Sequence, residues 1–381
     1  MNWDLLFIII FFIILYGIYF LYREKFHNQG IFVMYRTKLG LKLMNRLAKK
    51  VPRLLKIFSF VGIIFGYSGM AFIFYFLVKG VIDLIFVTNA LPVVSPLLPG
   101  IEIAPGLPVL SFWHWIIGIL IIATIHEFSH GVYARLYKVK IKSSGFAFFG
   151  PILAAFVEPD EKQLMKKNKK KQLGVLVAGP FSNVITGFIF LGIFFLLSLF
   201  IFSGLNLQGI TIAEVNQNLP INNSGLAAGD IITNIDGVEI VNLTQVEELI
   251  GVHKPGEIIL FGNVNKTWNV HTTSNSENAT LIGISFISYY GEFGLGTKIG
   301  AWFIELFFWL WVMSFGVGLF NLLPLGPVDG GRMFYLACLG ITKDKNKAER
   351  IWKAVSFFCL ALILINLLPW IVKLFTWLLG I

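Results

Sequence analysis

The 381-residue sequence has few charged residues and only two cysteines. Charged side chains make up 14% of the chain and hydrophobic ones 56%, whereas soluble domains carry roughly 25% charged residues. This shortage of charge excludes a water-soluble enzyme. The cysteines, Cys338 and Cys359, lie in or beside apolar stretches near the C-terminal end, which excludes a disulfide framework and a cysteine metal cage.

Long apolar runs and 38 phenylalanines are present instead. They exclude a disordered or collagen-like chain, because such sequences lack the apolar surface that offsets the entropy lost on ordering. A hydrocarbon layer about 30 Å thick needs roughly 20 apolar residues of helix. Runs near this length predict about six membrane spans: Leu5–Tyr22, Phe58–Val78, Phe112–Leu136, Leu173–Phe202, Ile299–Leu323 and Ile351–Leu379.

The net charge of +10 could indicate a nucleic-acid partner, so the positions of the basic residues decide the question. Of the 31 lysines and arginines, 25 fall in three connections between spans, Arg23–Lys56, Arg135–Gln172 and Thr342–Lys353. Basic residues are retained on the cytoplasmic side, so these connections are predicted to be cytoplasmic, and residues 80–108 and 204–297 to face outward. The threading places both chain ends outside and predicts a lipid bilayer as partner and no nucleic acid.

The outward segment of about residues 206–288 differs in composition from the spans. It is acidic, and short β-rich runs such as GITIAEV and EIILFGNV alternate with Asn, Gly and Pro, which predicts a soluble inserted domain. Four Asn-x-Ser/Thr sequons fall here and nowhere else, consistent with an outside location: Asn222, Asn242, Asn265 and Asn278. The predicted parts are 1–57 and 58–111 with the first two spans, 112–203 as a membrane core, 204–298 as the insert and 299–381 as a second membrane core.

The third run contains an HExxH motif, His126-Glu127-Phe128-Ser129-His130. Residues four apart share a helix face about 6 Å apart along the axis, so both imidazoles can bind one zinc ion. Glu127 lies about 100° round the helix and is placed to activate a zinc-bound water as general base. Short motifs also arise by chance, but three ionisable groups in five positions of an apolar span are expensive unless they have a function.

A catalytic zinc has three protein ligands and an open position, so a third ligand must come from elsewhere. The best candidate is Asp329, because residues 321–331 hold two prolines and three glycines that must interrupt a helix in or near the bilayer. We expect Asp329 and the HExxH motif to lie partway in from the cytoplasmic face. Other ionisable residues are too distant along the helix or lack ligand spacing: His114, about 18 Å from His126, Glu305, and Glu158 in a predicted loop.

Three motifs resemble the site-2 protease family of intramembrane zinc metalloproteases. They are HEFSHGVYA at 126–134, AGPFSN at 178–183 and FNLLPLGPVDGG at 320–331, and the resemblance covers most of the chain. It implies hydrolysis of peptide bonds within or near transmembrane segments of membrane-anchored proteins. For the site it implies zinc bound by His126, His130 and Asp329, Glu127 as catalytic base, and Asn183 and Asn321 as residues that hold the substrate backbone or the oxyanion, with plain helix packing as the alternative for both.

Two further segments are similar to parts of that family. Residues 145–159 resemble its membrane-associated β segment, whose edge can pair with an unwound substrate, the alternative being a buried hairpin. Residues 224–232 resemble the PDZ domains of bacterial relatives. The expected fold is therefore mainly α, a polytopic helical membrane protein of about six spans with an inserted extracytoplasmic PDZ-like α/β domain and a small membrane-associated β segment.

Two functions from other classes compete with the protease. Broken helices and intramembrane acids also occur in ion-coupled transporters, but no matching halves are visible in the sequence. A catalytically silent scaffold should lack a ligand or the base, and the sequence retains all four residues. The prediction is thus a multi-pass cell-membrane protease with its active site in the bilayer toward the cytoplasmic side.

Overall fold

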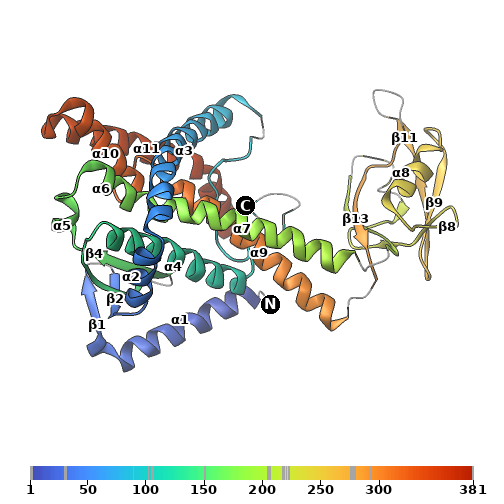
Figure 1. Cartoon of the computed structure of the whole chain (residues 1–381). Helices are drawn as coiled ribbons and strands as arrows, with labels where there is room; N and C mark the ends of the chain where they lie inside the picture. The colour runs from blue at the N-terminus through green and yellow to red at the C-terminus, as the bar shows by residue number, and fades with distance from the viewer. Residues whose placement is uncertain are drawn as a thin grey trace. The chain divides into compact units, whose positions relative to one another are not determined.

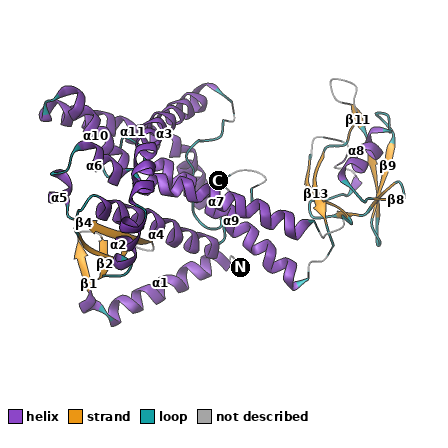
Figure 2. Cartoon of the chain, in the orientation of Figure 1, coloured by secondary structure: helices purple, strands orange, loops and turns teal. Residues whose placement is uncertain are grey.

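A computed structural model describes residues 3–379 except 30–31, 89, 102, 104–106, 150–151, 204–206, 217–218, 220, 222–223, 275–279 and 292–293. The chain forms two compact units (Figure 1). Unit 1 comprises Met1–Phe194 and Glu305–Ile381, and unit 2 comprises Phe195–Ile304. Figure 2 shows that unit 1 is mainly helical, whereas most strands belong to unit 2.

The membrane-spanning capacity resides in long apolar helices. Within the described residues, five helices are long and apolar enough to cross a bilayer, and the apolar helix α1 has 19 residues. The fold is that of a polytopic helical membrane protein, which confirms the predicted class. The helices are α1 Trp3–Leu21, α2 Leu41–Lys50, α3 Pro52–Phe86, α4 Phe112–Leu136, α5 Glu161–Met165, α6 Lys169–Leu176, α7 Ala178–Phe202, α8 Leu243–Gly251, α9 Leu295–Phe320, α10 Asp329–Thr342 and α11 Lys345–Leu379.

Two predicted spans differ most from the helices observed. The run Leu173–Phe202 is not one helix, since α6 ends at Leu176 and α7 begins at Ala178. Pro180 lies in the first turn of α7, where its missing N–H has no helical partner to lose, and this explains the new start. The run Phe58–Val78 is too short, because α3 starts with Pro52 at its first turn and continues for 35 residues.

A four-stranded antiparallel sheet packs beside α2 and α4 in unit 1 (Figure 1). The predicted β segment forms the hairpin of β3, Ile141–Phe149, and β4, Ile152–Pro159. The strands β1, Phe26–Gln29, and β2, Phe32–Thr37, were not predicted, and β2 pairs with β3. Among the described strands, the order β1-β2-β3-β4 leaves β4 at an edge of the sheet, with a strand partner on one side only.

Unit 2 is a small α/β domain with its own core. Strands β5, β6 and β13 form one sheet, strands β7 to β10 another, and α8 packs its buried Val246 into the shared hydrophobic cluster. The sequon residue Asn242 caps α8, accepting from the backbone N–H of Gln245, while Asn222 and Asn278 lie outside the described residues. The strands are β5 Gly209–Val215, β6 Ile231–Ile232, β7 Asn234–Ile235, β8 Val238–Glu239, β9 Ile258–Gly262, β10 Thr267–His271, β11 Thr273–Ser274, β12 Thr280–Leu281 and β13 Ile284–Tyr289.

Candidate metal centre and active-site cavity

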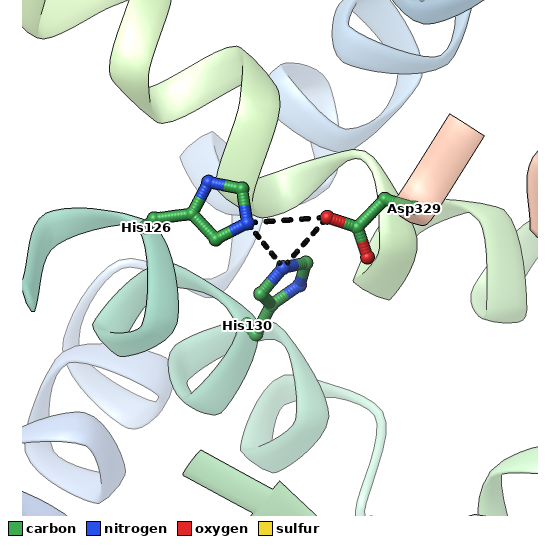
Figure 3. Close-up of side chains that lie close together, drawn as sticks. All are labelled: His126, His130 and Asp329. Carbon is green, nitrogen blue, oxygen red and sulfur yellow. Dashed lines mark hydrogen bonds and ion pairs between the residues drawn. The ribbon is translucent and has the colours of Figure 1, made fainter. Parts of the chain in front are cut away.

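Helix α4 presents the HExxH histidines on one face, as predicted. Its start is fixed by Ser111, whose hydroxyl accepts from the backbone N–H of His114, and by Asp4, whose carboxylate accepts from Phe112 N–H. One turn apart near the other end of α4, His126 and His130 are 8% and 9% exposed. Their Nε2 atoms lie 3.1 Å apart, so both rings point to the same place (Figure 3).

Asp329 reaches the same place from the broken helix. Its Oδ2 lies 3.1 Å from His126 Nε2 and 3.2 Å from His130 Nε2 (Figure 3). Helix α9 ends at Phe320 and α10 begins at Asp329, so the segment rich in proline and glycine separates two helices, as predicted. The two residues after Asp329 must be glycine: a Cβ would lie 2.2 Å from Leu322 O at Gly330 and 2.0 Å from Leu325 O at Gly331.

The donor set fits a zinc ion. Tetrahedral ligand atoms roughly 2.0–2.1 Å from zinc lie about 3.3 Å from one another, close to the 3.1 to 3.2 Å that separate the three atoms here. A second observation is Gly179 in the first turn of α7: a Cβ there would lie 2.4 Å from His130 Nε2 and 2.5 Å from His126 Nε2. Glycine thus keeps open the space that faces the imidazole nitrogens.

Hydrogen bonds behind the rings favour the tautomer that a metal requires. The backbone carbonyl of Val175, near the end of α6, lies 2.7 Å from His130 Nδ1 and accepts its proton, which leaves Nε2 free to bind. The side-chain amide of Asn183 lies 3.1 Å from His126 Nδ1, and Asn183 Oδ1 is buried without a hydrogen-bond partner. Turning this amide over lets Oδ1 accept from His126 Nδ1–H, which satisfies the oxygen and frees His126 Nε2.

Glu127 lies at the meeting of α4 with the free edge of β4. Its Oε2 accepts a 2.9 Å hydrogen bond from the backbone N–H of Val157. Since this N–H points away from β3, it belongs to the unpaired edge of β4. The edge strand is therefore tied directly to the residue predicted to be the base.

A cavity of about 420 Å³ opens onto these groups. Its walls include the HExxH residues, Asp329, Asn321 and residues 156–159 of β4. Among the described residues, the wall contains Asn321 but not Asn183, which is fully buried. Charged side chains join the wall at Lys142, Glu158, Glu161 and Arg332, so the lining mixes charged and apolar groups.

The residues rejected as third ligand have other partners. His114 is 1% exposed, and its Nδ1 lies 3.4 Å from Glu305 Oε1 of α9 and 2.8 Å from Ser111 Oγ. It is thus a buried histidine whose imidazole contacts α9 and the start of its own helix. Glu158 lies in β4 and not in a loop, and it pairs with Arg36 at 3.6 Å and Lys142 at 3.8 Å.

Three contributors to the site were missed from the sequence: Gly179, Val175 and Arg332. Gly179 belongs to the AGPFSN motif, which was a signal, but its position over the imidazoles depends on how α7 packs. Val175 contributes a backbone carbonyl, which carries no sequence signal. Arg332 lines the cavity, and its Nη1 lies 3.2 Å from Glu161 Oε1.

Comparison with known proteins gives a family and several relatives. Residues 114–365 match the profile of Peptidase family M50. The chain is 32% identical to an uncharacterized protein, MJ0971, of Methanocaldococcus jannaschii, over 84% of this chain and 81% of that protein. It is 24% identical to the zinc metalloprotease RasP of Shouchella clausii, over 59% of this chain and 65% of that protein.

Among solved structures, the PDZ domain of an SdrC-like protein from Listeria monocytogenes is similar to part of the chain. The match has 25% identity and a TM-score of 0.20, and it covers 21% of this chain and 88% of that domain.

Proposed function

Because the chain belongs to Peptidase family M50, the site-2 protease family, we propose that it is a zinc metallopeptidase that hydrolyses peptide bonds within or near transmembrane segments of membrane-anchored proteins. The observation that carries the proposal is the triangle of His126, His130 and Asp329, with ligand atoms 3.1 to 3.2 Å apart, beside Glu127 in one cavity. Ionisable groups in an apolar span mark a functional site, and two histidines with one carboxylate are the donor set of a catalytic zinc.

In this mechanism His126, His130 and Asp329 would hold zinc, which would supply Lewis-acid chemistry to the scissile carbonyl and to the attacking water. Glu127 accepts a proton from the attacking water and passes it to the nitrogen of the leaving amine. Val157 N–H holds Oε2 of Glu127 and so fixes the orientation of the carboxylate, which leaves Oε1 available to accept the proton. The Val175 carbonyl keeps the ring of His130 in the binding orientation.

Substrate is held in extended form along β4. A helix hides its own carbonyls in hydrogen bonds, so a transmembrane segment must unwind before it is cut. The free edge of β4 offers backbone groups that pair with such a strand next to Glu127. Asn321, which lines the cavity, contacts the substrate backbone, whereas Asn183 acts through His126.

The charge distribution gives the orientation that we propose. The active-site cavity lies within the bilayer toward the cytoplasm, because the basic connections flank it in the chain. The inserted α/β domain, residues 204–298 by sequence, lies outside. Outside, a PDZ-like peptide groove would meet the extracytoplasmic parts of substrates.

A cleavage assay tests the function. Purified protein in detergent is incubated with a panel of transmembrane peptides, with and without a chelator, beside Glu127→Gln. The matched control is Glu239→Gln, the same change at an exposed residue of unit 2. We expect cleavage by the native protein and the control, loss of cleavage in Glu127→Gln, and loss with chelator that added zinc reverses. Cleavage that survives both treatments would contradict the proposal.

A further inference from the structure

A second cavity adjoins the one that holds the metal ligands. It measures about 260 Å³ and shares Leu164, Leu176 and Arg332 with the larger cavity. Both belong to unit 1, so their relation is fixed within one compact body. The side cavity is therefore a direct neighbour of the active-site cavity, with these three residues lining both.

Its lining is mostly apolar, with Gln172, Arg332 and Glu349 as the polar members. Leu164 and Leu176 are 4% and 5% exposed, and they form the boundary with the larger cavity. The rings of Tyr335 and Trp352 meet edge to face with centroids 6.0 Å apart. Met165 and Leu336 complete the apolar lining. Such a surface binds an apolar group and gives little to a charged one.

An ion pair lies beside the two cavities. Arg332 Nη1 lies 3.2 Å from Glu161 Oε1, and both residues line the larger cavity. Their side chains are 44% and 60% exposed, so the pair is solvated and can move at small free-energy cost. Arg332 lines both cavities, whereas Glu161 lines only the larger one.

We propose that this apolar side cavity is the subsite for one large apolar or aromatic side chain of the substrate, next to the scissile bond. The inference rests on the proposed function and concerns which substrate side chains the protease prefers. An extended substrate in the larger cavity projects alternate side chains to opposite sides, so one residue near the cut points toward Leu164 and Leu176. Transmembrane segments are rich in such side chains. The cavity would favour cleavage at a peptide bond that places one of them in it.

Peptide hydroxamates test the subsite apart from turnover, because they carry their own metal-binding group. Two are compared, identical except for a benzyl or a methyl side chain, and their dissociation constants for the purified protein are measured. We expect benzyl to bind at least about tenfold more tightly than methyl. In Leu336→Trp the larger side chain fills the cavity, so we expect the ratio of the two dissociation constants to fall close to one. The affinity for the methyl hydroxamate should stay unchanged. The matched control is Leu199→Trp, the same change at a residue of α7 that is 69% exposed, and it keeps the native ratio.

A second variant tests the same cavity in the opposite direction. Trp352→Ala enlarges it, so a naphthyl hydroxamate gains affinity relative to benzyl. If Leu336→Trp fails to fold, this variant alone decides.

Four outcomes overturn the subsite. The subsite is overturned if the ratio of the two dissociation constants is unchanged in Leu336→Trp, or if the native protein shows no preference for benzyl. In either case, cleavage that a chelator abolishes still supports the proposed function. If Leu336→Trp binds both hydroxamates more weakly by the same factor, and added phospholipid has the same effect, the cavity is assigned to a lipid acyl chain. No cleavage and no hydroxamate binding by the native protein overturn both proposals.

Discussion

The carboxylate of Glu127 accepts a 2.9 Å hydrogen bond from the backbone N–H of Val157, which joins the HExxH helix to the free edge of β4. A single residue therefore both stabilises the edge strand and, as we propose, moves the proton in catalysis. These two roles can be separated by mutation, because an amide accepts a hydrogen bond as a carboxylate does but is a far weaker base.

Glu127→Gln should abolish catalysis and keep the structure. The glutamine oxygen still accepts from Val157 N–H, and the three proposed metal ligands are untouched. Loss of a general base lowers kcat by roughly 10²- to 10⁴-fold. We expect that drop in peptide cleavage, with native zinc content by elemental analysis and a native melting temperature. Glu127→Ala, which leaves the N–H unpaired, should lose activity and also melt earlier. A Glu127→Gln protein lacking zinc would show that Glu127 has a role in metal binding.

Gly179→Ala should prevent zinc binding. The added Cβ would lie within 2.5 Å of both imidazole nitrogens, which is closer than Cβ atoms approach other atoms. Gly192→Ala is the matched control, because it lies in the same helix and a Cβ there meets nothing within 4 Å. We expect elemental analysis to find about one zinc per chain in the native protein and in Gly192→Ala, and much less in Gly179→Ala. Native zinc content in Gly179→Ala would mean that the metal does not occupy the space in front of this glycine.

The sequence predicts the centre better than it predicts its surroundings. Local sequence patterns predict four residues of the proposed site. The HExxH residues His126, Glu127 and His130 follow from helical spacing alone, and Asp329 follows from the helix break that the neighbouring prolines predict. Helix α4 has the predicted bounds, since Ser111 caps its start and the apolar pattern ends at Leu136. These features could be predicted because each depends on residues that are close together in the sequence.

The missed features depend on contacts between distant segments. The pairing of β2 with β3 joins residues more than 100 positions apart, so no local pattern reveals it. Gly179 faces the imidazoles only because α7 packs against α4, and the Val175 carbonyl would reach His130 with almost any side chain at position 175. The break between α6 and α7 did have a signal, Pro180, which the uninterrupted hydrophobicity of the run concealed.

Asn183→Ala should weaken zinc binding without removing a ligand. The Asn183 amide is the described partner of His126 Nδ1, and residues that orient a metal-binding histidine typically contribute 10- to 100-fold in affinity, or roughly 1.4 to 2.7 kcal/mol. Asn183→Asp keeps an oxygen that accepts from Nδ1–H, so it should retain more of the affinity than alanine does. Competition with a fluorescent zinc chelator measures all three proteins. Equal affinity in Asn183→Ala and the native protein would assign Asn183 to packing or to substrate alone.

The orientation in the membrane can be measured with single cysteines, because both native ones, Cys338 and Cys359, are buried. Val264 in unit 2 is 94% exposed and Met165 in α5 is 61% exposed, so a cysteine at either position should react readily with a maleimide. The lysine-rich connection around Met165 is retained in the cytoplasm if basic residues set the threading. In intact cells an impermeant maleimide should therefore label Val264→Cys but not Met165→Cys, and permeabilised cells should label both. The reverse pattern would place the active-site cavity nearer the outer face and would invert the proposed threading of every span.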